Sequence, residues 1–170
     1  MVHLASMSEA EFQQYLAIAV PLYAQEHVRS GRWSEREALL RAQQEFDDHL
    51  TDGLNTKDQY FFTIVDEQTG MRVGILWFEI HSRKEEPSVY VYDIFVYEQY
   101  RRRGYGEQAF RAMEAKAYQL GLKTVAVHVF GHNYAARAMY EKLGYVITNL
   151  TMVKALDTPV LHPSNGNRSS

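Results

Sequence analysis

The chain has 170 residues, of which 46% are hydrophobic and 13% aromatic, so it is long enough for one domain with a sizeable core. Its formal net charge of −3 is too acidic for a general nucleic-acid-binding protein. It contains no cysteine, which excludes disulfide bonds and thiolate chemistry and is compatible with a cytoplasmic location. No run of about 18 apolar residues occurs, and the first residues are neither basic nor strongly apolar, so neither a membrane span nor a signal peptide is expected.

The N-terminal third predicts one strand and two helices. Residues 2–7 are expected to form a short strand, and Ser8 followed by Glu11 has the pattern of a capping box that begins a helix. Apolar residues then recur at helical spacing, but Pro21 lies within the pattern and is expected to kink or break the helix. A second helix is expected to begin at Ser34.

Three strands are predicted next, because β-branched and aromatic residues cluster in three runs. Residues 60–65 and 73–81 flank a turn that ends at Gly70, so they are expected to form a hairpin. A charged loop containing Pro87 follows, and residues 89–96 form the third predicted strand.

The second half alternates helices and strands. After Gly106 the apolar residues lie on one helical face, and Gly121 is a typical end for that helix. The later predicted segments are a strand at 124–130, a helix at 134–143, one or two strands at 145–153 and a disordered tail at 157–170. This order is typical of a mixed α/β domain, here residues 1–156, with helices on both faces of one sheet.

The turn between the third strand and the following helix favours an anion. Arg101, Arg102 and Arg103 supply positive charge that can pair with phosphate. Gly104 and Gly106 let the backbone approach a ligand closely. The unpaired N–H groups at the start of the helix, and its positive end, add to this preference. The sequence therefore predicts a site for a phosphorylated cofactor at this turn.

The same turn resembles the acetyl-CoA signature Q/R-x-x-G-x-G/A of the GNAT superfamily of N-acetyltransferases, through Arg101, Gly104 and Gly106. A second family element, N-x-x-A-x-x-[LM]-Y-x-x-x-G-[FY], follows in the expected order. It is matched by Asn133, Ala136, Met139, Tyr140, Gly144 and Tyr145. The order of predicted elements over residues 2–153 also matches the family.

The resemblance implies a GNAT-like fold with a mostly antiparallel sheet. The strands at 89–96 and 124–130 would be parallel and would splay apart to admit acetyl-CoA. The third strand's backbone would hold the pantetheine arm, the amides of the turn would hold the pyrophosphate, and the Asn133 side chain would bond the pantetheine or its thioester end. The implied cofactor-binding residues are Ile94, Phe95, Val96, Arg101, Arg102, Arg103, Gly104, Tyr105, Gly106, Glu107, Asn133 and Tyr140.

The implied reaction is the direct transfer of an acetyl group from acetyl-CoA to a primary amine of a peptide or small molecule. Tyr140 would be the general acid that protonates the leaving thiolate, and a core tyrosine is the ordinary alternative at its position. Asn133 could also cap the last helix. The alternative function is a non-catalytic acyl-CoA-binding sensor or interaction module on the same fold.

Several residues are candidates for the general base. His128 precedes Asn133 on the predicted strand, and histidine suits proton transfer near neutral pH; a strand histidine that bonds a neighbouring backbone group is the alternative. Glu79 and Asp93 each interrupt an apolar strand, and a water chain can replace a dedicated base. His128 and His132 do not share a face and lack a third ligand, so no metal is expected.

Acceptor recognition is expected from the first two helices, within residues 8–53, and from the loop at 82–88. Both segments mix positive and negative side chains, so the charge and identity of the acceptor do not follow from the sequence. A homodimer is left open.

Overall fold

A five-stranded sheet forms the centre of the protein. The computed structural model describes residues 1–81 and 86–154. The strands are β1 (Val2–Ser6), β2 (Gln59–Asp66), β3 (Arg72–His81), β4 (Ser88–Val96) and β5 (Val125–Val127), and they lie in this order across the sheet. The first four strands pair antiparallel, whereas β4 and β5 pair parallel. The predicted hairpin and the mostly antiparallel sheet are therefore confirmed.

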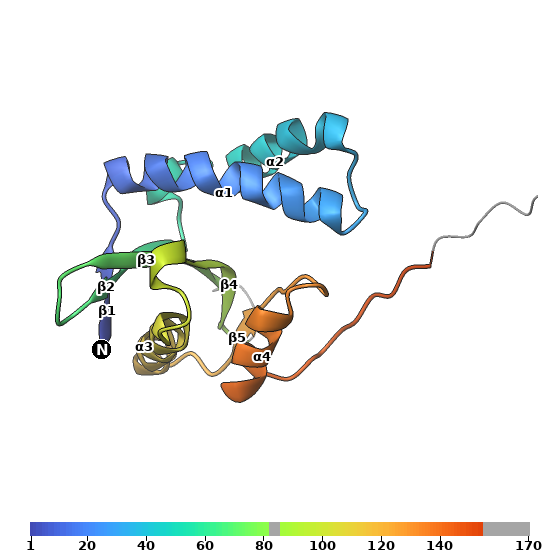
Figure 1. Ribbon diagram of the computed structural model, residues 1–170. Helices are drawn as coiled ribbons and strands as arrows, with labels where there is room; N and C mark the ends of the chain where they lie inside the picture. The colour runs from blue at the N-terminus through green and yellow to red at the C-terminus, as the bar shows by residue number, and fades with distance from the viewer. Residues whose placement is uncertain (82–85, 155–170) are drawn as a thin grey trace, which may run out of the picture.

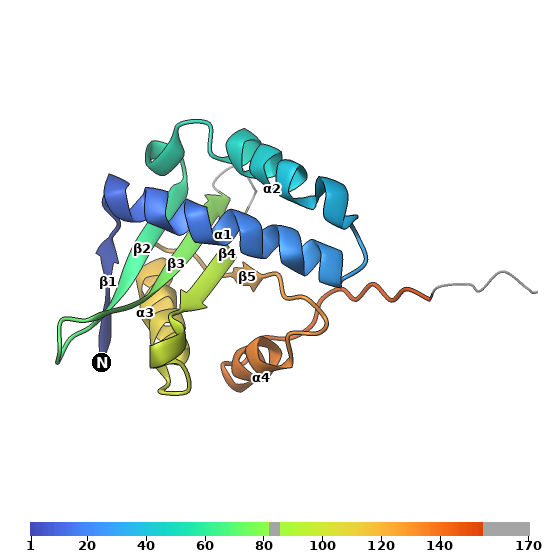
Figure 2. The same cartoon turned by 45° about the horizontal axis from the view of Figure 1, so that its top comes forward.

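Helices cover both faces of this sheet (Figure 1). The helices α1 (Glu9–Arg29) and α2 (Glu35–His49) cover one face, and α3 (Tyr105–Gln119) and α4 (Tyr134–Lys142) lie on the opposite side. Each side has its own apolar core, one built around Phe12, Phe46 and Trp77 and the other around Phe110 and Met113. The turned view in Figure 2 shows α1 running across β2, β3 and β4.

The first helix begins as predicted but is longer than expected. Ser8 and Glu11 form a complete capping box, and α1 then continues through Pro21 without interruption to Arg29. The prediction of a break at Pro21 is wrong. Buried residues on either side, Val20 and Ala24, hold the helix against the core, and this packing outweighs the one backbone hydrogen bond that proline removes.

A one-residue bulge in β4 turns Asp93 toward α1. Trp77 is paired with Asp93, but the next residue of β3, Phe78, is paired with Val91, so Tyr92 is an extra residue in β4. Val91 is buried in the core on the α3 side. The Tyr92 ring stacks on Trp77 at 4.6 Å. Because the bulge adds one residue, Tyr92 and Asp93 both face the α1 side.

The C-terminal strands differ from the prediction. The strand expected at 124–130 contains only three residues, because β5 leaves β4 after the pair Val91 and Val127. The expected divergence of these two strands is thus present. No strand forms at 145–153, so that prediction is wrong for the single chain. The predicted tail at 157–170 lies outside the described residues. In the described part of the chain, no helix is long and apolar enough to cross a membrane.

Candidate active site

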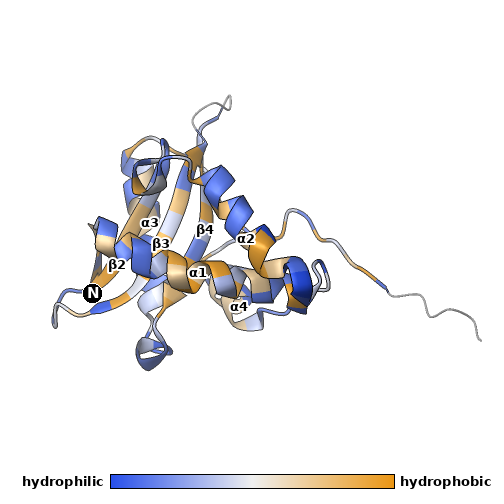
Figure 3. Ribbon diagram, turned by 90° about the horizontal axis from the view of Figure 1, so that it is seen from above, coloured by the Kyte–Doolittle hydropathy of each residue, from blue (hydrophilic) through white to orange (hydrophobic). Residues whose placement is uncertain are grey.

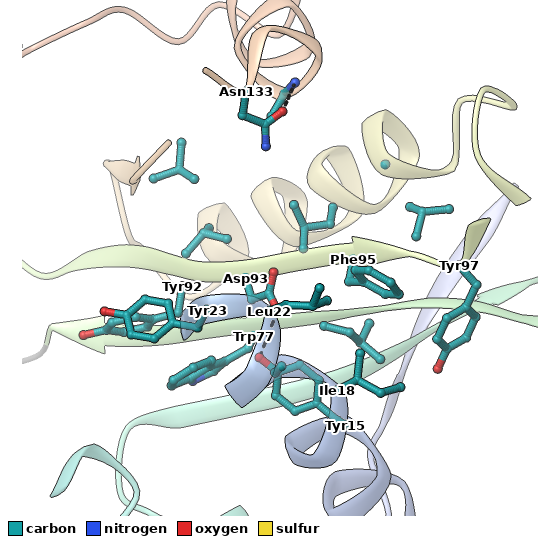
Figure 4. Close-up of a pocket in the computed structure, with 18 of the residues that line it drawn as sticks. Tyr15, Ile18, Leu22, Tyr23, Trp77, Tyr92, Asp93, Phe95, Tyr97 and Asn133 are labelled. Carbon is teal, nitrogen blue, oxygen red and sulfur yellow. Dashed lines mark hydrogen bonds between the residues drawn. The ribbon is translucent and has the colours of Figure 1, made fainter. Parts of the chain in front are cut away.

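A large cleft opens where β4 and β5 diverge. Its volume is about 1380 Å³, and its walls come from α1, α2, β4, the start of α3, the segment after β5 and α4. The close-up in Figure 4 shows aromatic side chains along the sheet side of this cleft and Asn133 on the opposite side. One end of the cleft is the turn at residues 101–106, here called the arginine–glycine turn. The other end lies between α1, α2 and the segment after β5.

The arginine–glycine turn presents backbone amides to the cleft. Gly104 is the N-cap of α3 in the left-handed conformation (φ +78°), and its carbonyl accepts from the Gln108 N–H at 3.1 Å. Arg102 is also left-handed (φ +62°), so the chain curls tightly into the helix. The amides that precede Gln108 belong to the first turn and have no intrahelical acceptor. Tyr105 and Gly106, which carry two of these amides, line the cleft.

The three predicted arginines have different surroundings. Arg101 donates from Nε to the Val96 carbonyl at 2.9 Å, and its guanidinium lies over the Phe95 ring. Arg102 lines the cleft, whereas Arg103 does not and lies over the Tyr100 ring at 5.9 Å. Arg101 also lines the cleft, but Arg102 is the one of the two whose side chain has no partner among residues 1–81 and 86–154, so it is better able to meet a phosphate there.

Side chains at the start of α3 fix that helix in place. The Tyr105 hydroxyl donates to the Asp66 carboxylate, and Glu107 accepts from Lys142 of α4 at 2.6 Å. A Cβ on Gly106 would lie 3.0 Å from the Met139 sulfur, so a glycine here lets α3 and α4 approach closely. The side chains of Tyr105 and Glu107 are therefore engaged within the protein, and the predicted cofactor contacts of these residues would come from their backbone N–H groups.

Tyr140 reaches the cleft from α4. Its side chain is buried, with 7% exposed, and packs against the rings of Phe110 and Tyr145. Burial raises the pKa of the Tyr140 hydroxyl, and the negative charge of Asp93 raises it further. Tyr140 therefore keeps its proton at neutral pH, as a general acid must. The ring belongs to the core and the residue also lines the cleft, so the role of Tyr140 as general acid stays a prediction.

Asn133 caps α4 and also borders the cleft. Its Oδ1 accepts from the Ala136 N–H at 3.1 Å, so the expected capping role is confirmed. Figure 4 shows the side-chain amide pointing toward the sheet across the cleft. Because capping uses only the oxygen, the two Nδ2 hydrogens are the part of this side chain that can bond a ligand.

Asp93 and Tyr15 form a pair on the sheet side of the cleft. The Tyr15 hydroxyl donates to Asp93 Oδ2 at 3.0 Å (Figure 4). Burial raises the pKa of Asp93 to about 6, and the hydrogen bonds from the Tyr15 hydroxyl and the Ile94 N–H offset part of that effect. A carboxyl group with this pKa is mostly ionised at neutral pH and can still accept a proton readily. Tyr15 was not predicted, because its place in the apolar stripe of α1 gave it the appearance of a core residue.

The other two candidates for the general base, His128 and Glu79, differ in whether they line the cleft. His128 directly follows β5, is exposed and lines the cleft. Partial desolvation of the ring by its neighbours, followed by the positive charge of Arg32, lowers the pKa of His128, which favours the neutral ring at pH 7. Glu79 is not among the residues that line the cleft, and its carboxylate accepts from Tyr92 at 3.0 Å and lies 3.4 Å from His49.

The end of the cleft between α1 and α2 is aromatic and acidic. Tyr23 donates to Glu45 at 2.8 Å, and Glu26 bonds the His132 ring. The cleft-lining residues at this end are Tyr23, Glu26, Glu45, Asp48, His49, Trp77, Tyr92, His128 and Phe130. The arginines of the two helices and their connection do not line the cleft. The lining of this end therefore carries more carboxylates than arginines, although the charge of Arg32 still reaches His128 and Tyr23.

Metal ligands are not gathered in this region. Within residues 1–81 and 86–154, no three His, Cys, Asp or Glu side chains are grouped so that they could hold a metal ion. The expectation of a metal-free site remains a prediction.

Comparison with known proteins agrees with this cleft. Residues 21–145 match the model of the acetyltransferase (GNAT) family. This chain belongs to the GNAT acetyltransferase family. The acetyltransferase is 36% identical over 157 residues to the uncharacterized N-acetyltransferase YycN of Bacillus subtilis, a match that covers 91% of this chain and 99% of YycN. It is 32% identical over 153 residues to the uncharacterized N-acetyltransferase YdgE of the same organism, covering 90% of this chain and 97% of YdgE.

The fold comparison gives the same result. The crystal structure of YycN matches this acetyltransferase with a TM-score of 0.88 and 33% identity, covering 93% of this chain and all of YycN. The family and the GNAT-like fold expected from the sequence are therefore confirmed. Acetyltransferases of the GNAT family use acetyl-CoA as acyl donor, so the cleft is the place to look for the donor site.

Proposed function

We propose that this acetyltransferase moves the acetyl group of acetyl-CoA directly to a primary amine, with Tyr140 as the general acid. The observation that carries the proposal is one continuous cleft with three chemical regions. Helix amides and Arg102 lie at one end, Tyr140 and Asp93 lie along it, and carboxylates and aromatic rings line the other end. Phosphates, a thioester and an amine need these three environments in this order.

Donor binding uses the predicted turn and strand. The amides from Arg102 to Glu107 hold the pyrophosphate, with charge from Arg102, and Asn133 Nδ2 bonds the pantetheine. The β4 backbone from Ile94 to Val96 pairs with the pantetheine arm. Besides the groups that pair with β3, two further groups of this strand already have partners, because the Ile94 N–H bonds Asp93 and the Val96 carbonyl accepts from Arg101. Binding along β4 therefore uses its other polar groups or exchanges these bonds.

The chemistry needs one proton acceptor and one proton donor. The neutral amine attacks the thioester carbon, the C–S bond breaks, and the Tyr140 O–H protonates the departing sulfur. The amine gives up its proton to a base, directly or through water. Asp93 and His128 both line the cleft and are mostly unprotonated at neutral pH, so these two residues are the candidates. Glu79 is set aside because it does not line the cleft.

The acidic end of the cleft supports an amine as the acceptor. Glu26, Glu45 and Asp48 give this end a negative potential, which attracts a protonated amine during approach. Asp93 further along can then accept the proton that the amine loses. A cytoplasmic location and the absence of a nucleic-acid partner, both expected from composition, remain predictions of this proposal.

The test is acetyl transfer from acetyl-CoA to a panel of peptide and small-molecule amines, measured by release of free thiol. Tyr140→Phe should lower kcat by at least about 100-fold while CoA binding is kept. The matched control is Tyr145→Phe, because the Tyr145 hydroxyl bonds Glu114 at 2.8 Å and does not line the cleft. Unchanged turnover in Tyr140→Phe would remove Tyr140 from the mechanism. CoA binding without turnover of any amine would favour a non-catalytic acyl-CoA-binding module.

A further inference from the structure

The two oxygens of the Asp93 carboxyl have different surroundings. Oδ2 accepts from the Tyr15 hydroxyl at 3.0 Å, and the Ile94 N–H also bonds this carboxyl. Figure 4 shows the bond to Tyr15 on the α1 side and the second oxygen pointing across the cleft, toward the side of Asn133. The protein therefore holds one oxygen while the other faces the cleft.

Tyr15 is a rigid donor. Its side chain is 6% exposed, and its ring packs against the rings of Phe61 and Trp77, with centroids 6.2 Å and 6.4 Å away. Figure 3 shows α1, which carries Tyr15, lying across strands whose residues are mostly apolar. Burial, followed by the negative charge of Asp93, raises the pKa of the Tyr15 hydroxyl. The hydroxyl therefore keeps its proton and remains a donor to Asp93 at neutral pH.

The bond from Tyr15 favours the ionised form of Asp93. In the described part of the chain, the ionisable side chains that face Asp93 from neighbouring elements are Tyr15 of α1, Tyr140 of α4 and, after the end of β5, His128. Its pair on β3 is Trp77, which carries no charge. Burial raises the pKa of Asp93, and the bond from Tyr15 is the largest effect that lowers it. A hydrogen bond to the ionised form stabilises that form, so Tyr15 offsets part of the cost of burying a carboxylate here.

The helix that holds Asp93 also forms a wall of the cleft. Ile18, Leu22 and Glu26 follow Tyr15 at spacings of three and four residues, so they share one face of α1, and all of them line the cleft. Ile18 and Leu22 are 46% and 40% exposed. A substrate in the cleft therefore contacts the same face of α1 that fixes the carboxyl of Asp93.

We propose that Tyr15 is a positioning residue for acetyl transfer, which holds Oδ2 of Asp93 so that the other carboxylate oxygen faces the attacking amine. The inference rests on the proposed function, with Asp93 as the base. The amine proton moves to this other oxygen as the N–C bond forms, and the Tyr140 O–H proton moves to the sulfur as the C–S bond breaks. Transfer of the proton from Asp93 to Tyr140, directly or through solvent, restores both groups. Tyr15 does not touch the reacting atoms, and its hydroxyl keeps its proton throughout.

The first test measures the titration of Asp93 itself and needs no activity. In NMR spectra of the labelled protein, the Asp93 carboxyl is identified by its loss in Asp93→Asn and should titrate at about pH 6. Tyr15→Phe removes the hydroxyl but keeps the ring, and should move this titration up by roughly one pH unit. The matched control is Tyr145→Phe, which removes a hydroxyl bonded to Glu114 at 2.8 Å, away from the cleft. It should leave the Asp93 titration in place.

The second test is the pH profile of acetyl transfer. In Tyr15→Phe the rising limb of kcat/KM should move up together with the Asp93 titration. The plateau above that limb should fall roughly tenfold, because the carboxyl is less well oriented toward the amine. The KM for acetyl-CoA should stay the same. A tyrosine that only packs against Phe61 and Trp77 would lower stability without moving the limb.

The outcomes separate this inference from the proposed function. An Asp93 titration that stays in place in Tyr15→Phe overturns the positioning role, whether or not amines are acetylated. A titration that moves without the kcat/KM limb also overturns it, while acetyl transfer itself stands. If no amine is acetylated, the proposed function fails, and the titration still shows whether Tyr15 holds Asp93.

A measurement on the wild type covers the case in which Tyr15→Phe does not fold. The buried Tyr15 hydroxyl proton should give an NMR signal that shifts as Asp93 titrates, because the acceptor of its hydrogen bond changes charge. A Tyr15 signal that is insensitive to pH through this range would contradict the proposal.

Discussion

At the scale of single residues, Asp93 is where structure and chemistry are most closely linked. The bulge at Tyr92 places this carboxyl on the α1 side of β4, where Tyr15 donates to it. Without the extra residue, Asp93 would point into the core on the α3 side, where an ionised carboxylate is strongly disfavoured. The same group raises the pKa of Tyr140 through its charge. The Asp93 carboxylate can therefore receive the proton of the amine, and its charge helps to keep the Tyr140 hydroxyl protonated.

The pH dependence of kcat/KM distinguishes the two base candidates. If Asp93 is the base, kcat/KM of the wild type rises with pH through about 6, where this carboxyl ionises. Asp93→Asn then lowers kcat/KM and removes that limb, whereas His128→Ala keeps it. The reverse pattern assigns the base to His128. Rates are compared as variant-to-wild-type ratios at each pH, so that titration of the amine cancels. A limb retained by both variants would indicate a water chain.

Asp93 should also lower the stability of the fold at neutral pH. Its pKa rises from 3.8 in the unfolded chain to about 6 in the fold, so the folded state holds the proton more tightly between these values. Stability is then greatest below the unfolded pKa and falls as pH rises through this window, by at most about 3 kcal/mol. Asp93→Asn should therefore raise Tm at pH 8 and give a much smaller gain at pH 4. Equal gains at both pH values would contradict the raised pKa.

At the scale of elements, α1 and α2 form the cleft wall that faces the acceptor in the proposed function. Both helices turn their apolar stripes to the sheet, and their ends bring carboxylates to the cleft. Glu45 is oriented by Tyr23 across the gap between the helices. Glu37 lies on the same helix as Glu45 but pairs with Arg41 and does not line the cleft. The two glutamates therefore offer a matched comparison.

Glu45→Gln should weaken binding of a cationic acceptor. Because Glu45 is exposed, its attraction to an ammonium group is modest, so KM for a diamine should rise roughly two- to fivefold. The KM for acetyl-CoA and kcat should stay unchanged, and the effect should shrink at high salt. Glu37→Gln should change none of these values. A Glu45→Gln enzyme with an unchanged KM for the diamine at low salt would show that this carboxylate does not face the acceptor.

The elements also show what the sequence could and could not reveal. The order of helices and strands, the hairpin, the capping box at Ser8 and the turn at Gly104 follow from local patterns, because neighbouring residues determine them. The continuity of α1 through Pro21 depends on packing against the core. The position of Asp93 depends on a register shift between β3 and β4, and such a shift leaves no mark in one strand's sequence. Residues 145–153 were predicted as a strand because their composition favours pairing, but a strand also needs a neighbour, which local composition does not specify.

At the scale of the whole molecule, the cleft joins parts that otherwise have few contacts. The α1 and α2 side and the α3 and α4 side have separate apolar cores on opposite faces of the sheet. Residues from all four helices line the cleft, so a ligand that fills it touches both sides. Because β4 and β5 pair over only three residues, the region around α4 relies on contacts such as the one between Lys142 and Glu107. Donor binding should therefore stabilise the molecule as a whole.

Thermal unfolding in the presence of CoA tests whether the donor stabilises the whole molecule and whether its phosphates bind at the arginine–glycine turn. CoA at 100 times its Kd should raise the free energy of unfolding by about 2.7 kcal/mol, which corresponds to a rise in Tm of roughly 5 to 10 °C for a chain of this size. Protein concentration is held fixed, because any association between chains would make Tm concentration-dependent.

Two variants in the arginine–glycine turn, Arg102→Ala and Arg103→Ala, test whether the CoA-induced rise in Tm depends on the proposed phosphate contact. Arg102→Ala should remove about half of the CoA-induced rise at the same CoA concentration, since losing one charge-assisted contact weakens binding by about tenfold, or 1.4 kcal/mol. Arg103→Ala should keep the full rise, because Arg103 lies over Tyr100 and does not line the cleft. The comparison uses the CoA-induced shift of each variant rather than its absolute Tm, because an alanine at the left-handed position of Arg102 is itself strained. A larger loss in Arg103→Ala than in Arg102→Ala would contradict the assignment of the phosphate site to the Arg102 side of the turn.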